Sequence, residues 1–288
     1  MPTLPPGEPA LPRSSPLRAH GVAESFGVDP ERYDRARPGY PGALIEAVLA
    51  AAPGGDVLDV GIGTGIAARR FRAAGCTVLG VDPDPRMADR ARRDGHEVEV
   101  AAFEAWDPDG RSFDAVISAQ AWHWVDPVAG AAKAAEVLRP GGRLAVFWND
   151  GRPPRDLARA FAEVYGRFAP DAPAARLWRA AGGEGEHPGY AALSVRAADG
   201  MRAAGAFDAP EVWRFAWEQA YTRDAWLDQL PTTGGHCGLP PAVLARLSAG
   251  AGAAVDAVGG AFTMRYTTIV VTAAHRGPGR TRPPADRG

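Results

Sequence analysis

The sequence predicts an α/β fold in which a seven-stranded, mostly parallel sheet is covered by helices on both faces. Two observations support this prediction. Short β-branched runs alternate with Ala- and Arg-rich segments of helical pattern, which is typical of a parallel sheet, and a glycine-rich turn joins the first run directly to a helix. The strands are expected at residues 57–60, 77–81, 98–102, 115–118, 143–148, 212–222 and 263–272.

The helices follow from apolar periodicity and from the residues that start or stop a helix. Pro41 stands where a first helical turn tolerates proline, ahead of an apolar helical pattern. Pro140-Gly141-Gly142 should end the helix before the fifth strand. Period-2 alternation in the sixth strand puts three aromatic side chains on one face, where we expect core: Trp213, Phe215 and Trp217. Further helices are expected at residues 65–74, 85–94 and 127–138.

The length of 288 residues fits one elaborated domain, which we place at residues 21–275. The Pro-rich start and the Arg/Pro/Gly-rich end lack a core pattern and are expected to be disordered tails, at 1–20 and 276–288. Two segments with a looser helical pattern interrupt the alternation and are expected to form a cap. They span about 151–187, broken at Gly182-Gly183-Glu184-Gly185, and about 223–258, with a turn at Gly234-Gly235.

Composition argues against several classes of protein. A net charge of -2 offers no excess of cations for a phosphate backbone, so nucleic acid is not an expected partner. Cys76 and Cys237 are too few for a disulfide framework and too far apart for a metal pair, so no metal is expected. No long apolar run or signal peptide is visible. We expect a bacterial, cytoplasmic protein, either a monomer or a homodimer, without membrane contact.

The sharpest local signal is a strand that runs into the turn Gly61-Ile62-Gly63-Thr64-Gly65 and then a helix. Glycines let the backbone approach a ligand closely. Asp59 stands at the carboxyl end of the strand, which faces the ligand crevice of an open parallel sheet, and its carboxylate suits an ammonium group. Asp82 ends the next strand, where an acid accepts hydrogen bonds from ribose hydroxyls; the alternative is an ordinary helix cap before Pro83.

These residues, Asp59 to Gly65 followed by Val81-Asp82, resemble the first two motifs of class I S-adenosylmethionine-dependent methyltransferases. The resemblance implies a Rossmann-like class I methyltransferase fold and S-adenosylmethionine as cofactor. It also implies that the glycine loop holds the methionine and ribose portions, that Asp82 binds the ribose, and that Phe103 and Glu104 enclose the adenine.

Further segments extend the resemblance. The predicted fourth strand, residues 113–120, is similar to the family motif beneath the methionine end of the cofactor, which places Gln120 in the cofactor site. Residues 138–144 are similar to its turn into the fifth strand. Residues 33–41 and 121–126 resemble the trans-aconitate methyltransferase-like (methyltransferase type 11) group, which implies a small-molecule methyl acceptor.

Methyl transfer from a sulfonium needs alignment and exclusion of water, with no covalent nucleophile. Aromatic faces stabilise a sulfonium charge by cation–π attraction. The candidates are Tyr33 and Trp124, together with Tyr40 and Trp122, which we place in the substrate pocket. His123 is the candidate general base for a phenol or amine, whereas a carboxylate acceptor needs no base. Plain packing is the alternative for each of these side chains.

Two arginines are candidates for holding a carboxylate in a bidentate pair. Arg37 is assigned to the cofactor site. Arg35 is an alternative clamp or a solvated surface charge.

Three other functions fit these residues less well. An NAD(P)-dependent oxidoreductase predicts a third glycine where this chain has Ala68, and it leaves Asp59 unexplained. A non-catalytic scaffold on a cofactor fold predicts loss of the loop or of its acids, and none is lost. A tRNA or ribosomal RNA methyltransferase fits poorly with the near-neutral charge. Transfer of a methyl group to an oxygen or nitrogen of a small molecule is therefore the expected function.

Overall fold

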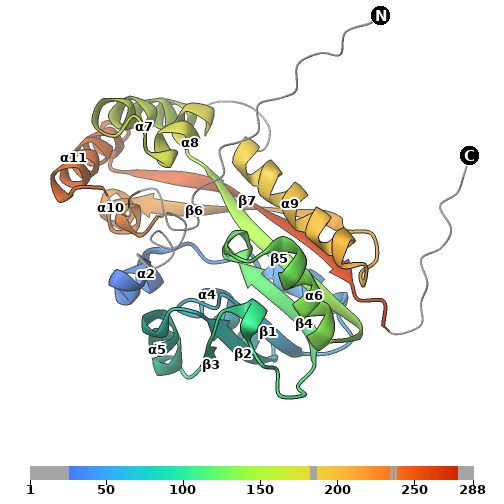
Figure 1. Cartoon of the computed structure of the whole chain (residues 1–288). Helices are drawn as coiled ribbons and strands as arrows, with labels where there is room; N and C mark the ends of the chain where they lie inside the picture. The colour runs from blue at the N-terminus through green and yellow to red at the C-terminus, as the bar shows by residue number, and fades with distance from the viewer. Residues whose placement is uncertain (1–25, 182–186, 234–235, 237–238, 278–288) are drawn as a thin grey trace, which may run out of the picture.

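The computed structural model describes residues 26–181, 187–233, 236 and 239–277. These residues form a seven-stranded sheet in the order β3-β2-β1-β4-β5-β7-β6, in which β7 runs antiparallel to β5 and β6 and the other pairs are parallel (Figure 1). The seven predicted strands are confirmed. Their bounds are β1 Asp56–Val60, β2 Thr77–Asp82, β3 Glu97–Val100, β4 Phe113–Ala119, β5 Leu138–Arg152, β6 Glu211–Thr222 and β7 Ala261–Ala274.

Several predicted features lie outside the described residues. They are the 1–20 tail, nearly all of the 276–288 tail, the break at Gly182-Gly183-Glu184-Gly185, the turn at Gly234-Gly235, and Cys237. Arg276 is described, and its guanidinium donates to Asp208 over 3.1 Å.

Helices cover both faces of the sheet, as the fold prediction requires. On one face pack α3 (Gly42–Ala50), α4 (Ile66–Ala73) and α5 (Pro85–Arg93), and on the other pack α6 (Pro127–Val137) and α9 (Pro188–Ala204). Successive residues of β1 point to opposite faces of the sheet. Val57 packs in the core under α3, α4 and α5, Leu58 packs in the core under α6 and α9, and both are fully buried.

The starts of α5 and α6 show why the sequence forms helices there. Asp84 and Asp126 cap the two helices by accepting backbone N–H groups, and a proline follows each cap at the first helical position. The carboxyl ends of β2 and β4 therefore connect to their helices by short, fixed turns.

Strand β5 is longer than the predicted 143–148 at both ends. It begins at Leu138, directly after α6, so Pro140-Gly141-Gly142 lies within the strand and does not end the helix. At the other end, Asn149 to Arg152 continue to pair with Thr268 to Arg265 of β7. This extension carries two polar residues, Asn149 and Asp150, past the end of β4, which stops at Ala119. Both are buried, at 4% and 3% exposure. The extension thus projects buried polar side chains beyond the edge of the parallel sheet.

Four helices gather at the far ends of β6 and β7 (Figure 1). They are α7 (Arg155–Phe168), α8 (Pro173–Ala181), α10 (Arg223–Gln229) and α11 (Pro241–Ala257). They share an aromatic core with the strand residues Tyr221, Phe262 and Tyr266. Phe161 lies at its centre, with ring centroids 5.2 Å from Trp178 and 5.5 Å from Trp226.

Two features differ from the sequence-based expectation. The 17-residue helix α9 was not predicted as an element, because Gly189 and Gly200 and a run of alanines blur its periodicity. Trp213, Phe215 and Trp217 are only half-buried, since β6 is the edge strand of the sheet. Neither α9 nor any other helix in the described ranges is long and apolar enough to cross a membrane.

Replacing Phe161 by alanine should lower the free energy of unfolding by about 3–5 kcal/mol, because the ring is fully buried in the aromatic core. Urea unfolding followed by circular dichroism measures the loss. The matched control is Val258→Ala, whose side chain is 45% exposed, and we expect a change within about 0.5 kcal/mol. Equal losses in the two variants would contradict the packing described.

Candidate functional site

The glycine loop between β1 and α4 is held close to its neighbours. Gly61 and Gly65 have φ angles of 70° and 89°, a region that favours glycine. A Cβ at Gly61 would lie 2.4 Å from the Cβ of Ala121, and one at Gly65 would lie 2.7 Å from the His96 ring. A side chain at either position would therefore displace the loop from the carboxyl end of β1.

Ile62 points away from the crevice. Its side chain is 5% exposed and lies over Gly80 of β2, where an added Cβ would come within 2.4 Å of Ile62 Cδ1. The bulky residue in this loop is thus an anchor in the core, and it leaves the ligand-facing side of the loop to the backbone.

Asp59 is the most unusual group of the site. Its carboxylate is completely buried at the end of β1, and neither oxygen accepts a hydrogen bond of ordinary geometry among the described residues, although the nearby backbone N–H of Ala68 lowers its pKa slightly. Burial, and secondarily the neighbouring Asp82 carboxylate, raises the pKa of Asp59 to about 8. A buried carboxyl group without a partner is costly, so this position is built for a cationic or hydrogen-bond-donating ligand.

Asp82, at the end of β2, is tied to the glycine loop. One oxygen accepts the backbone N–H of Gly63 over 2.8 Å and the other accepts that of Asp84 over 2.9 Å. Burial raises its pKa to about 6 against the lowering effect of these two hydrogen bonds. The cap of α5 is Asp84 and not Asp82, so the helix-cap alternative for Asp82 does not apply. Each oxygen keeps a further acceptor position.

Three predicted cofactor residues follow β3 and β4. Phe103 is buried, with its ring centroid 6.3 Å from those of Trp106 and Trp122, so much of its surface packs in the core. The Glu104 carboxylate accepts the backbone N–H of Asp126 over 2.9 Å. Gln120 has a φ of 58°, unusual for a residue other than glycine, and its backbone is fixed by a 2.9 Å bond to Phe147.

The segment 33–41 lies across the ends of the central strands. Tyr40 is buried and packs edge-on against Phe147 of β5, with ring centroids 5.0 Å apart. Asn149 of β5 donates to the Gly39 carbonyl over 3.0 Å. Arg37 lies 5.3 Å from the Tyr33 ring centroid, and its guanidinium makes no hydrogen bond or ion pair with the part of the chain that the structure describes. This free guanidinium is therefore available to an anionic group.

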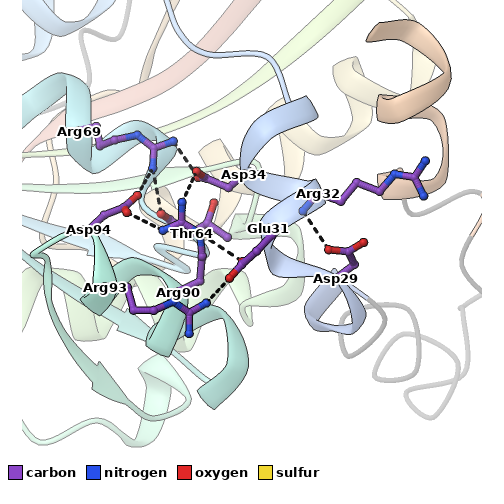
Figure 2. A network of polar contacts seen from close by, with 9 residues as sticks. All are labelled: Asp29, Glu31, Arg32, Asp34, Thr64, Arg69, Arg90, Arg93 and Asp94. Atoms are coloured by element: carbon purple, nitrogen blue, oxygen red, sulfur yellow. Dashed lines mark hydrogen bonds and ion pairs between the residues drawn. The ribbon is translucent and has the colours of Figure 1, made fainter. Parts of the chain in front are cut away.

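Helix α2 (Pro30–Ala36), which precedes Arg37, is held by ion pairs to α4 and α5, the helices that follow β1 and β2 (Figure 2). Asp34 accepts from Arg69 of α4 over 2.8 Å and from Arg90 of α5 over 2.9 Å. Both arginines also pair with Asp94 at the end of α5, and Glu31 pairs with Arg90. The network joins three helices around the glycine loop.

The opposite side of α2 contacts α10, one of the four helices at the far ends of β6 and β7, which we call the cap helices (α7, α8, α10 and α11). Arg32 and Arg35 both bind Asp228 of α10, at 3.0 Å and 2.8 Å. The Arg35 guanidinium is thus engaged by an acid of the chain itself, which leaves Arg37 as the arginine of this segment with an unoccupied head group. In Figure 1, α2 lies between the cap helices and α5.

The segment 121–126 connects β4 to α6, and its three ring-bearing side chains lie in different surroundings. Trp122 is buried in the core beneath α6, against Phe103 and the backbone at Gly130. His123 Nδ1 accepts the indole N–H of Trp148 over 3.3 Å, and burial lowers the pKa of His123 to about 4. Trp124 is 37% exposed and meets Phe26 at a centroid distance of 6.5 Å.

The structure thus brings together Asp59, Asp82 and the glycine loop, with Tyr40 and Arg37 on the neighbouring segment. Sequence reasoning missed the residues that hold this segment in place, namely Asp34, Arg69, Arg90 and Asn149. No local signal marks them, because each acts through a partner at least 35 residues away in the chain.

The amino-acid sequence is similar to known methyltransferases. Residues 58–146 match the family described as "Methyltransferase domain". The chain is 42% identical over 145 residues to an uncharacterized methyltransferase of Mycobacterium tuberculosis, which covers 50% of this chain and 59% of that protein. It is 36% identical over 153 residues to the demethylmenaquinone methyltransferase of a Mycobacterium species, covering 52% of this chain and 64% of that protein. The chain therefore spans about three-fifths of the length of these relatives.

One solved structure resembles most of the fold. A proposed type II methyltransferase from Anaeromyxobacter dehalogenans superimposes with a TM-score of 0.60 at 24% identity, covering 83% of this chain and 97% of that one. At that identity the likeness concerns the fold alone.

Asp59→Asn should stabilise the ligand-free protein, by about 4 kcal/mol more at pH 8 than at pH 5. The reason is that a carboxyl whose pKa is raised by folding to about 8 destabilises the fold progressively as pH rises from its unfolded value, while asparagine carries no such penalty. Urea unfolding at both pH values measures the difference. Asp224→Asn, at a side chain 90% exposed, is the control and should show no such pH dependence. A destabilising effect of Asp59→Asn at pH 8 would contradict the burial penalty.

Proposed function

We propose, from the class I methyltransferase domain that residues 58–146 form, that this protein transfers a methyl group from S-adenosylmethionine to an oxygen or nitrogen atom of a small molecule. The observation that carries the proposal is the completely buried, unpartnered Asp59 carboxylate beside the glycine loop. The cofactor's methionine portion carries an ammonium group that matches this acceptor in charge and in hydrogen-bonding capacity.

The residues around Asp59 fit the remaining parts of the cofactor. The glycine loop lets a ligand approach its backbone closely, and Asp82 keeps free acceptor positions for two ribose hydroxyls. Arg37 carries an unpaired guanidinium suited to the methionine carboxylate. Phe103 and Glu104 follow β3, at the place where the family resemblance implies that the adenine binds. Both side chains also have partners in the chain, since Phe103 packs on Trp106 and Glu104 accepts the Asp126 N–H.

When bound, the cofactor supplies an electrophilic methyl group on a sulfonium. The chain's own contribution is to hold the acceptor in line and to exclude water. Tyr33 and Tyr40, on the segment that α2 and Asn149 fix over the strand ends, present aromatic surface to this region. Burial of Tyr40 raises its pKa well above the ordinary range, which keeps the hydroxyl neutral.

His123 is weakly suited to act as the general base. Its Nδ1 accepts a hydrogen bond from the indole N–H of Trp148, so the neutral ring carries its proton on Nε2 and has no free lone pair to offer a substrate. The pKa of about 4 makes it a poor proton acceptor as well. Trp122, packed under α6, supports the neighbouring segment from the core.

S-adenosylmethionine should bind the purified protein in isothermal titration calorimetry, and NADH and NADPH should not. The expected selectivity follows from Asp59, whose carboxyl group ionises against the ammonium group of S-adenosylmethionine, whereas the pyrophosphate of the nicotinamide cofactors offers it no cation. Asp59→Asn should lower the affinity for S-adenosylmethionine at least tenfold, by loss of a charge-assisted hydrogen bond. The Asp224→Asn variant should bind like the wild type. Binding of a nicotinamide cofactor alone would make the protein an oxidoreductase, and binding of neither would favour a scaffold.

Asp34→Asn should weaken S-adenosylmethionine binding about fivefold at low salt, because it releases α2 and the attached Arg37 from Arg69 and Arg90. The loss should shrink at high salt, where the wild-type ion pairs are also screened. Asp89→Asn is the matched control, since it removes an ion pair with Arg92 on the outer side of α5, where the Asp89 side chain is 60% exposed. If the two variants bind equally well, the clamp plays no part in holding the cofactor.

A further inference from the structure

A second acid stands at the same edge of the sheet as Asp59, on the extension of β5. Asp150 accepts two hydrogen bonds from one residue: the backbone N–H of His187 donates to Oδ2 over 3.2 Å, and the ring Nδ1 donates to Oδ1. Arg152 faces Asp150 Oδ2 at 3.8 Å. Asp150 and His187 are 3% and 2% exposed. The imidazole is therefore held at two points, at the start of α9.

This arrangement fixes which ring nitrogen is free. Because Nδ1 donates to the carboxylate, the neutral ring has its lone pair on Nε2. That atom is buried and has no hydrogen-bond partner among the described residues. The tautomer is opposite to that of His123, whose Nδ1 is the acceptor. His187 thus carries a preformed, unused proton acceptor, oriented by the carboxylate of Asp150.

The surroundings connect His187 to the methyl-transfer site. Its ring lies 6.3 Å from that of Tyr190, in an edge-on contact. Burial raises the pKa of Tyr190 to about 12, and this hydroxyl lies within electrostatic reach of both Asp150 and Arg37. Tyr40 in turn lies within reach of Tyr190 and of Asp59. Electrostatic interactions therefore link Asp59 to Asp150, the partner of His187, through the buried Tyr40 and the partly buried Tyr190.

We propose that His187 is the general base of the methyl transfer, with Asp150 as its positioning residue, and that the acceptor is a small molecule with a neutral hydroxyl group. This inference rests on the proposed methyltransferase function. A carboxylate acceptor needs no base and would meet the lone pair of Nε2 without a proton to share. A hydroxyl donates to that lone pair, so the site selects an alcohol or phenol.

The step balances within the groups named. The acceptor O–H proton passes to His187 Nε2, and the electron pair that it leaves on oxygen supports the new bond to the methyl carbon. The carbon–sulfur bond breaks with its electron pair going to sulfur, which removes the sulfonium charge. The products are a methyl ether, S-adenosylhomocysteine and an imidazolium whose charge Asp150 balances.

The first test needs no acceptor. Long-range ¹H–¹⁵N spectra of the whole protein, free and with S-adenosylhomocysteine, report which nitrogen of each of the six histidines carries a proton. His187, assigned by its loss in His187→Gln, should be protonated on Nδ1, and Asp150→Asn should shift it towards the Nε2-protonated form. A ring protonated on Nε2 in the wild type would overturn the proposal.

The second test separates catalysis from packing. Phenol and 4-nitrophenol are offered with radiolabelled S-adenosylmethionine near pH 8.5, where phenol keeps its proton, since its pKa of about 10 matches that of tyrosine, and 4-nitrophenol is ionised. His187→Gln should lower kcat/KM for phenol about 100-fold or more and leave the ionised probe nearly unchanged. His275→Gln, at the opposite end of the sheet, is the matched control and should behave as wild type.

Each other outcome is informative. Equal losses for both probes would overturn the role as base, because a purely structural defect does not distinguish a neutral from an ionised acceptor. Methylation of neither probe by a wild type that binds S-adenosylmethionine in calorimetry would count against a hydroxyl acceptor. Absence of S-adenosylmethionine binding would instead defeat the proposed function itself. If His187→Gln fails to fold, the comparison is made with Asp150→Asn.

Discussion

A carboxylate buried without a partner is one of the more expensive features a fold can contain, and Asp59 is such a group. Its position follows from β1, which has both faces covered and delivers its last side chains to the edge of the parallel sheet. The glycine loop packs closely at this edge, because a side chain at Gly61 or Gly65 would collide with Ala121 or His96. The ligand-free protein therefore keeps an acid with a pKa of about 8, and that penalty is removed when a cation binds.

The other parts of the site are arranged around this acid. Asp82 fixes the loop from β2, and Asn149 fixes the segment bearing Arg37 and Tyr40 from β5. Helix α2 is held on one side by Asp34 to α4 and α5 and on the other by Asp228 to α10. The same short helix contacts α4 and α5 on one side and α10 on the other. A shift of either group of helices would therefore move the segment that carries Arg37.

Much of this architecture was predictable from local sequence. The seven strands, the glycine turn and its two acids have strong short-range patterns, since β-branched runs and glycines report directly on backbone conformation. The length of β5 was not predictable, because Asn149 to Arg152 are strand only through pairing with β7. Likewise, Asp150 and His187 are 37 residues apart and lie in a region without clear periodicity, so no local pattern pairs them. His123 lies in a segment with a recognisable pattern, which makes it the base candidate that the sequence predicts. Tautomers depend on such long-range partners.

Asp59 should be protonated in the free protein and ionised when it holds an ammonium group, because burial raises its pKa. Calorimetric titration with S-adenosylmethionine at pH 7, in two buffers of different ionisation enthalpy, measures the protons exchanged on binding. With a pKa of about 8 in the free protein, binding should release close to one proton, and Asp59→Asn should abolish the release. Tight binding of S-adenosylmethionine with no proton released would contradict the claim that this buried carboxylate receives the cofactor.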